Sequence, residues 1–256
     1  MQRSFLNAER PLLTCMVQAH TPERIKELID LSLPEGAEAF GMQLCRLQEE
    51  YKNAEIYKEL FAYAKGKPVY VTNYRKVRGK VDSDKSDEIY AEELIEIAEC
   101  GATLVDVMGD YFDPCEGELT MDADAVRKQK ELIGALHQRG AEVLMSSHVL
   151  KYVSAERVLE IALAQEERGA DIAKIVVCAE NTEEQLEVFR AFELLKANLK
   201  IPFLFLSGGE CSHLSRRIGG VLGNCMSLCV YEYDALATAV QPLLRDMKLV
   251  RELLQP

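Results

Sequence analysis

The sequence predicts a single (β/α)8 barrel over residues 1–256, and two observations lead to this fold class. Short apolar runs rich in β-branched residues alternate along the chain with amphipathic stretches of helical period. The length of 256 residues is close to the roughly 250 residues typical of one such barrel. An open doubly wound sheet is the alternative, but it is expected to carry a glycine-rich turn after its first strand. The turn from Val17 to Pro22 has no glycine.

The expected elements follow one another as strand and helix along the whole chain. Strands are expected at residues 12–19, 37–44, 68–74, 103–108, 142–148, 172–179, 203–208 and 225–231. Helices are expected at residues 22–33, 53–65, 86–100, 122–139, 154–168, 182–198, 213–222 and 233–254. No linker rich in proline, glycine or serine divides these elements, so we expect one catalytic domain.

Several helix ends carry residues that favour a start or a stop. Thr21 can cap the first helix, with Pro22 at its first position. Ser154 and Asn181 can cap two later helices. Glu184 is placed to accept a hydrogen bond from the backbone of Asn181, as in a capping box. Glycines supply stops at Gly101, Gly140 and Gly169.

Composition narrows the class of protein. The chain has 48% hydrophobic residues, a share that is typical of a globular protein. Its formal net charge of -12 argues against nucleic-acid or anionic-membrane partners. No apolar run approaches the ~18 residues that span a bilayer. The first ten residues carry charge where a secretory signal needs an apolar core, so we expect a cytoplasmic protein. The eight scattered cysteines then predict reduced thiols, and without a Cys-x-x-Cys pair no metal site is expected.

Lys174 is the strongest anomaly among the expected strands, because it interrupts an otherwise apolar run. Alternation places Ile172, Lys174 and Val176 on one face, and in a barrel one face of each strand is the interior. A lysine in such an interior loses hydration, which favours the neutral amine that attacks carbonyl carbons. Pairing with an interior carboxylate such as Asp106, or an outward orientation, would account for the same lysine without this chemistry.

Two further residues stand at strand ends, where barrel chemistry is expected. His148 ends the fifth strand, next to the strand that carries Lys174, and histidine suits proton transfer near neutral pH. After the seventh strand, the segment that begins at Ser207 leads to Arg216, whose guanidinium can grip a carboxylate. A solvated histidine and a surface arginine are the alternative interpretations.

These residues resemble the type I 3-dehydroquinate dehydratase family. The lysine motif of the family, Gly-Ala-Asp-Ile-x-Lys-Ile, is similar to residues 169–175, and its Met-Ser-x-His segment is similar to residues 145–148. Its Ser-Arg-x-x-Gly pattern resembles residues 215–219. Three matches in order, all near strand ends, make the resemblance much more specific than any one motif.

The resemblance implies a barrel enzyme of the shikimate pathway, and hence of aromatic amino acid biosynthesis, that removes water from 3-dehydroquinate. Lys174 would form an iminium with the ketone, so neither a metal nor another cofactor is implied. His148 would assist iminium formation, take the C2 proton and protonate the departing hydroxyl group. Arg216 would hold the carboxylate of this small anionic keto-acid. A homodimer is also implied.

The chain departs from the family where substrate hydroxyl groups are bound. The charged residues of the second strand, Glu-x-Arg-x-Asp, align with Gly41-Met-Gln43-Leu-Cys45, which leaves Gln43 as the candidate contact. Arg75 is an offset counterpart of the arginine on the third strand, and Ser207 is a further candidate contact. The final Pro-Gly-Gln lid is absent.

The family glutamate that orients the catalytic histidine is also missing, because Met108 aligns with it on the fourth strand. Asp106 and Asp110 are the candidates for this role, and Glu210 is a third carboxylate near the expected site.

Three functional hypotheses remain open from the sequence. The first is the dehydratase, or a divergent relative that acts on a similar keto-acid. The second is a Schiff-base aldolase or lyase of the same fold that acts on a different carboxylated ketone. The third is a barrel without catalysis that keeps an anion pocket around Arg216.

Overall fold

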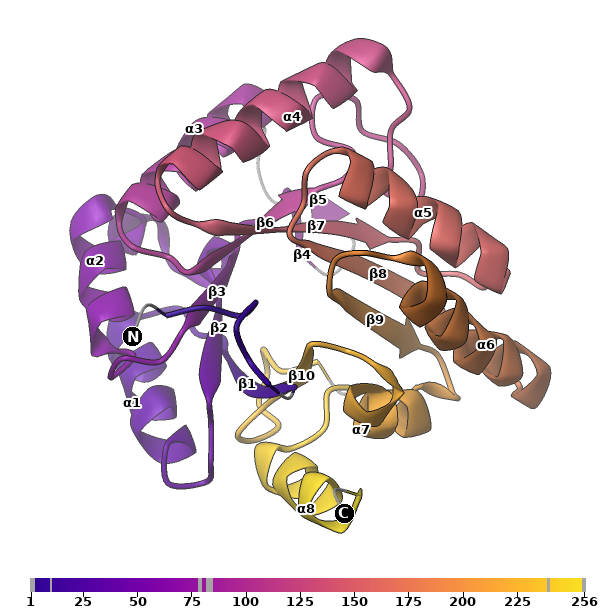
Figure 1. Ribbon diagram of the computed structural model, residues 1–256. Helices are drawn as coiled ribbons and strands as arrows, with labels where there is room; N and C mark the ends of the chain where they lie inside the picture. The colour runs from indigo at the N-terminus through magenta and orange to yellow at the C-terminus, as the bar shows by residue number, and fades with distance from the viewer. Residues whose placement is uncertain (1–2, 10, 78–79, 82–84, 239, 255–256) are drawn as a thin grey trace.

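The computed structural model describes residues 3–9, 11–77, 80–81, 85–238 and 240–254, and in these ranges eight parallel strands form one sheet. The strands lie side by side in the order β10-β1-β2-β3-β6-β7-β8-β9, with the helices around the outside (Figure 1). Their bounds are Leu12–Val17 (β1), Ala39–Gln43 (β2), Val69–Thr72 (β3), Leu104–Met108 (β6), Glu142–His148 (β7), Ile172–Cys178 (β8), Phe203–Gly208 (β9) and Met226–Cys229 (β10). The predicted (β/α)8 barrel is confirmed.

A helix follows each strand of the barrel, as the alternation of the sequence predicts. The helices are Pro22–Ser32 (α1), Ala54–Tyr63 (α2), Asp87–Glu99 (α3), Ala123–Gln138 (α4), Ala155–Glu167 (α5), Thr182–Asn198 (α6), Ser212–Leu222 (α7) and Leu244–Leu254 (α8). None of the helices in the described ranges is long and apolar enough to cross a membrane. All eight cysteines are free thiols.

The predicted helix signals are confirmed at most positions. Thr21, Ser154 and Asn181 each accept a hydrogen bond from a backbone N–H in the first turn of their helices. Glu184 accepts a hydrogen bond from the backbone N–H of Glu180, one residue before the expected donor, Asn181. The three predicted glycine stops all have positive φ angles, which glycine adopts without the strain that a Cβ would cause.

The barrel closes between β9 and β10 through a side chain. The two strands are joined by a single bridge between Phe203 and Asn224 and by a bond from the backbone N–H of Cys225 to the oxygen of Phe203. The buried amide of Asn224 accepts from the N–H of Phe205 at 2.7 Å and donates to its carbonyl oxygen at 3.0 Å. The amide therefore replaces a neighbouring strand at the seam.

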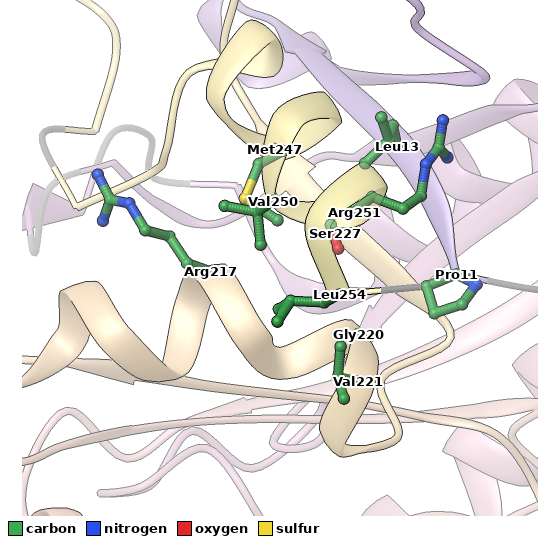
Figure 2. A pocket seen from close by; sticks show the side chains of 10 residues that line it. All are labelled: Pro11, Leu13, Arg217, Gly220, Val221, Ser227, Met247, Val250, Arg251 and Leu254. Carbon is green, nitrogen blue, oxygen red and sulfur yellow. The ribbon is translucent and has the colours of Figure 1, made fainter. Parts of the chain in front are cut away.

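The helices beside this seam leave a small apolar cavity between them. It has a volume of about 220 Å³ and lies between α7 and α8, on the outside of the barrel (Figure 2). Arg217 projects from α7 and Arg251 from α8 at its edges. Arg251 is paired with Glu38 at 2.6 Å.

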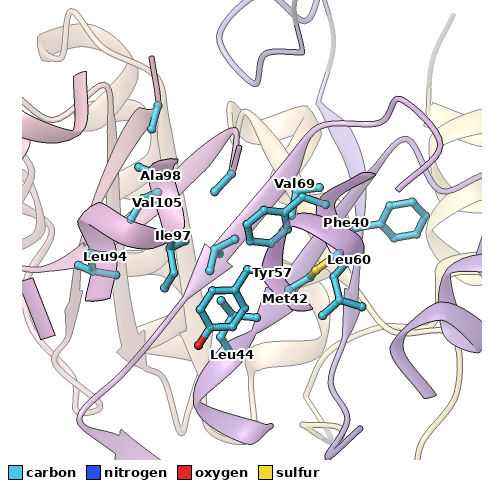
Figure 3. Packing of buried hydrophobic residues seen from close by; sticks show 14 of the residues in the cluster. Phe40, Met42, Leu44, Tyr57, Leu60, Val69, Leu94, Ile97, Ala98 and Val105 are labelled. Atoms are coloured by element: carbon cyan, nitrogen blue, oxygen red, sulfur yellow. The ribbon is translucent and has the colours of Figure 1, made fainter. Parts of the chain in front are cut away.

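The apolar core forms two layers, one between the strands and the helices and one inside the barrel. Figure 3 shows part of the outer layer, where side chains of α2 and α3 pack against those of β2, β3 and β6. The inner layer includes Tyr70, Leu104, Leu144 and Ile172, which point inward from neighbouring strands. The side chains of each strand therefore point alternately into the inner and the outer layer, as expected for a barrel.

The prediction of one helix over residues 233–254 is wrong in its first half. Asp234 accepts bonds from the backbone N–H groups of Leu236 and Ala237, which forms a turn, and α8 begins only at Leu244. Pro242 has no N–H to contribute to a helix and stands two residues before this start. Residue 239 lies outside the described residues.

Two small features were not predicted. A short hairpin pairs Lys76–Val77 (β4) with Lys80–Val81 (β5), and two 3-10 turns, Leu44–Arg46 (η1) and Glu49–Tyr51 (η2), follow β2. Parts of the charged N-terminal segment that argued against a secretory signal, residues 1–2 and 10, lie outside the described residues.

Candidate active site

A cavity of about 570 Å³ opens at the carboxyl ends of the strands. Lys174, His148, Arg216 and Gln43 line it, so the structure brings together four of the residues predicted for the site. This is the face of a (β/α)8 barrel on which active sites form. In the described part of the chain, no group of three or more histidine, cysteine or acidic side chains is arranged to hold a metal ion.

Lys174 points into the barrel, which is one of the two orientations that strand alternation allowed, and its side chain is almost fully buried. Ile172 and Val176 belong to the inner layer, whereas Ala173 and Ile175 face the helices. The outward orientation is therefore excluded. The lysine is 4% exposed and reaches the floor of the cavity.

Three oxygens surround the amine of Lys174. Its Nζ atom lies 2.6 Å from the hydroxyl of Tyr74, 3.0 Å from that of Tyr70 and 3.1 Å from a carboxylate oxygen of Asp106. An ammonium group has three protons to donate, so each has an acceptor. The resting lysine is thus an ion-paired ammonium, and the pairing with Asp106 considered from the sequence is present.

Asp106 is the counter-ion of this lysine rather than a partner of the histidine. Its carboxylate accepts bonds from the hydroxyls of Tyr70, Tyr74 and Ser146. Burial by itself would raise the pKa of Asp106, but the charge of Lys174 and these hydroxyl donors outweigh it and lower that pKa. Asp106 therefore stays ionised beside the ammonium.

The carboxylate that orients His148 is Glu118, which the sequence analysis did not identify. Nδ1 of His148 lies 2.6 Å from a carboxylate oxygen of Glu118, and the backbone N–H of His148 donates to the same oxygen at 3.2 Å. If Nδ1 carries a proton for this bond, Nε2 is left free to accept one. The prediction of Asp106 or Asp110 for this role is corrected.

Glu118 lies in the long loop between β6 and α4, which packs closely on the strand ends. Its carbonyl oxygen accepts a bond from the hydroxyl of Ser147 at 2.8 Å. A Cβ on Gly109 would come within 2.6 Å of that same carbonyl oxygen, so glycine is needed for the approach. The available signal was a loop with five acidic residues, among them Glu116 and Glu118, at the carboxyl ends of the strands.

Arg75 and Asp110 form part of the support of this loop, not of the cavity wall. Arg75 forms buried ion pairs with Asp87 and Asp110. Asp110 also accepts from the backbone N–H of Cys115 at 3.1 Å. Arg75 does not line the cavity, so its predicted contact with substrate is corrected, and the preceding Tyr74 lines the cavity instead.

Arg216 is a cation of the site for which the described residues supply no acidic partner. Its Nε atom donates to the carbonyl oxygen of Ser207 at 2.7 Å, and no carboxylate within the described ranges lies at ion-pair distance. Burial lowers the pKa of Arg216 to about 10, so the group remains charged at neutral pH. A half-buried, unpaired guanidinium at the edge of a cavity is suited to an anionic ligand.

The remaining predicted contacts differ in their positions. The hydroxyl of Ser207 is buried against that of Ser215, so Ser207 supports Arg216 through its backbone and does not line the cavity. Gln43 lines the cavity and accepts a bond from Arg46 at 3.4 Å. Glu210 is exposed, with its backbone N–H bonded to Glu180, and takes no part in the cavity wall.

We expect the Glu118→Gln variant to change how stability depends on acid. Burial raises the pKa of Glu118, but bonds from His148 outweigh it, so the folded-state pKa lies below the unfolded value of about 4.3. A lowered pKa contributes stability above the unfolded pKa, and this contribution is lost as the pH falls through the folded pKa. The difference in unfolding free energy between wild type and variant should therefore shrink between pH 6 and pH 3, as measured by urea titration.

Glu116→Gln is the matched control for this measurement. Glu116 lies in the same loop but is exposed, and its ion pair is with Lys151. Its profile should run nearly parallel to that of the wild type, because exposed pairs contribute little. A constant difference between wild type and Glu118→Gln over the whole pH range would contradict the role given to the Glu118 carboxylate.

The family model and the curated relatives that match the sequence point to one family. A family model described as Type I 3-dehydroquinase matches residues 14–255. A 3-dehydroquinate dehydratase of Lactiplantibacillus plantarum is 26% identical over 147 residues, which cover 55% of this chain and 57% of the relative. One of Alkaliphilus oremlandii is 33% identical over 115 residues, or 44% of each chain. The chain thus matches about half the length of these curated relatives.

A solved structure resembles the whole fold. It is the type I 3-dehydroquinate dehydratase of Clostridium difficile with covalently modified comenic acid, and the TM-score is 0.80. The alignment covers 97% of this chain and 94% of that one at 20% identity. At this identity, the likeness shows the shared barrel.

Proposed function

The chain belongs to the type I 3-dehydroquinase family, and on this premise we propose that it eliminates water from 3-dehydroquinate through a Schiff base on Lys174. The observation that carries the proposal is the position of this lysine, whose amine lies inside a cavity that also contains an oriented histidine and an unpaired arginine. The three groups supply a nucleophile, a base and an anion site in one place.

The proposed reaction begins when the ammonium group of Lys174 gives up a proton, which passes to the ketone oxygen as the resulting amine attacks the carbonyl carbon. Loss of water from the adduct gives an iminium, which accepts the electrons left when the neighbouring C–H bond breaks. His148 takes this proton on Nε2 and returns it to the hydroxyl group that leaves as water. Hydrolysis of the iminium then releases the product and regenerates Lys174, so the covalent imine supplies the electron sink without a cofactor.

Glu118 and Arg216 position these steps. Glu118 holds Nδ1 of His148, which fixes the ring and stabilises the imidazolium that forms during proton transfer. Arg216 binds the substrate carboxylate and so sets the distance of the ketone from Lys174. Gln43, at the rim, is the proposed contact to a substrate hydroxyl group.

A second candidate is a Schiff-base aldolase or lyase that acts on another carboxylated ketone. The observation that favours it is the wall of the cavity, where Met16, Met108, Leu206 and Leu228 are apolar. A site that discriminates a polyhydroxylated ring is expected to present more buried polar groups than this. This candidate keeps Lys174 as the nucleophile.

The experiment that tests the proposal is reduction with borohydride in the presence of 3-dehydroquinate. We expect a stable adduct on Lys174 by intact mass and peptide mapping, together with ultraviolet absorbance of the conjugated product. A panel of other carboxylated ketones runs in parallel. Turnover without an adduct would contradict the mechanism, and trapping of a different ketone alone would favour the aldolase or lyase. Ligand-induced stabilisation without any adduct would favour a barrel that only binds anions.

Domain organisation, cellular location and oligomeric state are part of the same proposal. We propose that residues 1–256 act as one catalytic domain in the cytoplasm, without nucleic-acid or membrane partners, and that the chain forms a homodimer. In support of a dimer, α8 exposes the apolar side chains of Leu249 and Leu253. α8 also carries charges of both signs, so two copies related by a two-fold axis can pair them. Light scattering in solution measures the mass that decides between one and two chains.

A further inference from the structure

Tyr70 in β3 and Tyr74 just after this strand both lie beside the amine of Lys174, but they differ in how much of their surface is exposed. Tyr70 and Tyr74 both lie within hydrogen-bonding distance of Nζ, and both donate to the same oxygen of Asp106. Tyr70 has no exposed surface, whereas Tyr74 is half-buried at the cavity wall. Tyr74 also stacks edge-on against His148, with ring centroids 5.2 Å apart.

The position of Tyr74 matters because iminium formation moves protons at the nitrogen. A ketone and an ammonium group become an iminium and water: the nitrogen loses two protons, the carbonyl oxygen gains both, and the C–O bond breaks as the C=N bond forms. A group that touches the nitrogen and faces the cavity can carry these protons. Tyr70 and Tyr74 both touch the nitrogen and line the cavity, but of the two only Tyr74, at 2.6 Å from Nζ, has exposed surface.

The other groups near the amine are less suited to this transfer. Asp106 is wholly buried and already accepts three hydroxyl bonds, and Lys174 and these donors keep it ionised. His148 is engaged by Glu118, and within the described residues no hydrogen bond joins it to Lys174. Neither group therefore offers a direct path from the nitrogen to the oxygen of a bound ketone.

We propose that Tyr74 carries protons between Nζ of Lys174 and the carbonyl oxygen of the substrate while the iminium forms and while it is hydrolysed. The O–H bond of Tyr74 first turns from Asp106 toward the cavity. The phenol oxygen then accepts a proton from the nitrogen, and the original phenol proton passes to the substrate oxygen. Two such transfers complete the balance, and Tyr74 ends as it began. The proposal rests on the lysine imine of the proposed function and assigns this step to Tyr74, which leaves the C–H step to His148.

The charge state of Tyr74 agrees with this role. Burial, together with the charge of Asp106, raises the pKa of Tyr74 well above its ordinary value. The phenol is therefore neutral over the working range and can donate and accept in one event. A phenolate beside Asp106 would lack the proton that the substrate oxygen needs.

The test compares Tyr74→Phe with Tyr70→Phe by rapid mixing and borohydride quenching, with the adduct on Lys174 followed by mass. Both variants remove a hydroxyl that contacts the same lysine and the same aspartate, so Tyr70→Phe controls for weakening of the ion pair. One arm uses 3-dehydroquinate and the other 4-oxopentanoate, a plain carboxylated ketone. We expect Tyr74→Phe to slow adduct formation about 100-fold, the lower end of what a positioned proton-transfer group contributes.

The amount of adduct at equilibrium provides the second readout. A proton carrier speeds formation and hydrolysis equally, so Tyr74→Phe should reach the wild-type level of adduct after long incubation. Tyr70→Phe should slow adduct formation much less than Tyr74→Phe does, because it only weakens the ion pair of Lys174. Equal slowing in both variants, no slowing in Tyr74→Phe, or a lower final level in that variant alone would overturn the proposal.

The two ketones separate this inference from the proposed function. If wild type traps 4-oxopentanoate but not 3-dehydroquinate, the dehydratase proposal fails and the 4-oxopentanoate arm still decides the role of Tyr74. If wild type traps neither ketone, the lysine imine itself is wrong and both proposals fall.

Discussion

Replacing Lys174 with methionine is expected to abolish the borohydride adduct and to lower turnover at least about 10⁴-fold, the scale on which enzymes lose rate without their nucleophile. Methionine fills a similar volume inside the barrel but offers no amine to a ketone. The iminium that acidifies the substrate C–H bond can then no longer form. Steady-state turnover and intact mass measure the two effects independently.

The same substitution is also expected to destabilise the fold, because it leaves Asp106 without its counter-ion. Removing one partner of a buried ion pair typically costs about 3–5 kcal/mol. The double variant Lys174→Met with Asp106→Asn removes the stranded charge and should regain much of the lost unfolding free energy, while activity stays absent. If the double variant were as unstable as the single one, the loss would come from packing rather than from the unpaired carboxylate.

The face of Lys174 was predictable in part because a strand has a period of two. Alternation groups Lys174 with Ile172 and Val176, but both faces of this strand are apolar, so the inward orientation was one of two alternatives until the structure decided it. The three oxygens around its amine were harder to predict. They come from β3, from the segment just after it and from β6, and only the register of the strands from β3 to β8 brings Tyr70, Asp106 and Lys174 together.

The carboxylate of Glu118 could not be predicted from strand pattern at all. It lies in a loop of more than ten residues, where no periodicity indicates which side chain turns inward. The strand position that aligns with the family glutamate holds Met108, which lines the cavity without a charge. The loop instead brings Glu118 to the imidazole, so the partner of His148 is supplied from a different element.

The region before α8 shows a different limit. Residues 233–243 read as the start of an amphipathic helix, but the turn at Asp234 and the missing N–H of Pro242 prevent it. Val230 and Leu243 instead form a bridge that extends the wall of the barrel. The local helical pattern was overridden here by this backbone contact with the segment just after β10, which the pattern itself does not reveal.

Replacing His148 with asparagine is expected to lower turnover by about 10³-fold while the adduct on Lys174 still forms. The amide cannot take the C2 proton, but iminium formation depends on Lys174 and, as proposed, Tyr74. A substrate iminium should therefore accumulate, and borohydride should trap more of it during turnover than in the wild type. The trapped mass distinguishes this adduct from one of product.

Glu118→Gln extends the same argument by one contact. The side-chain amide of the glutamine can either accept a hydrogen bond from Nδ1 of His148 or donate one to it. When the amide donates, the proton of the imidazole lies on Nε2, which can then no longer act as the base. Turnover should lie between that of wild type and that of His148→Asn, with adduct formation retained. If both variants lost adduct formation as fully as turnover, His148 would be needed for the iminium itself, and the division of work between His148 and Tyr74 would be wrong.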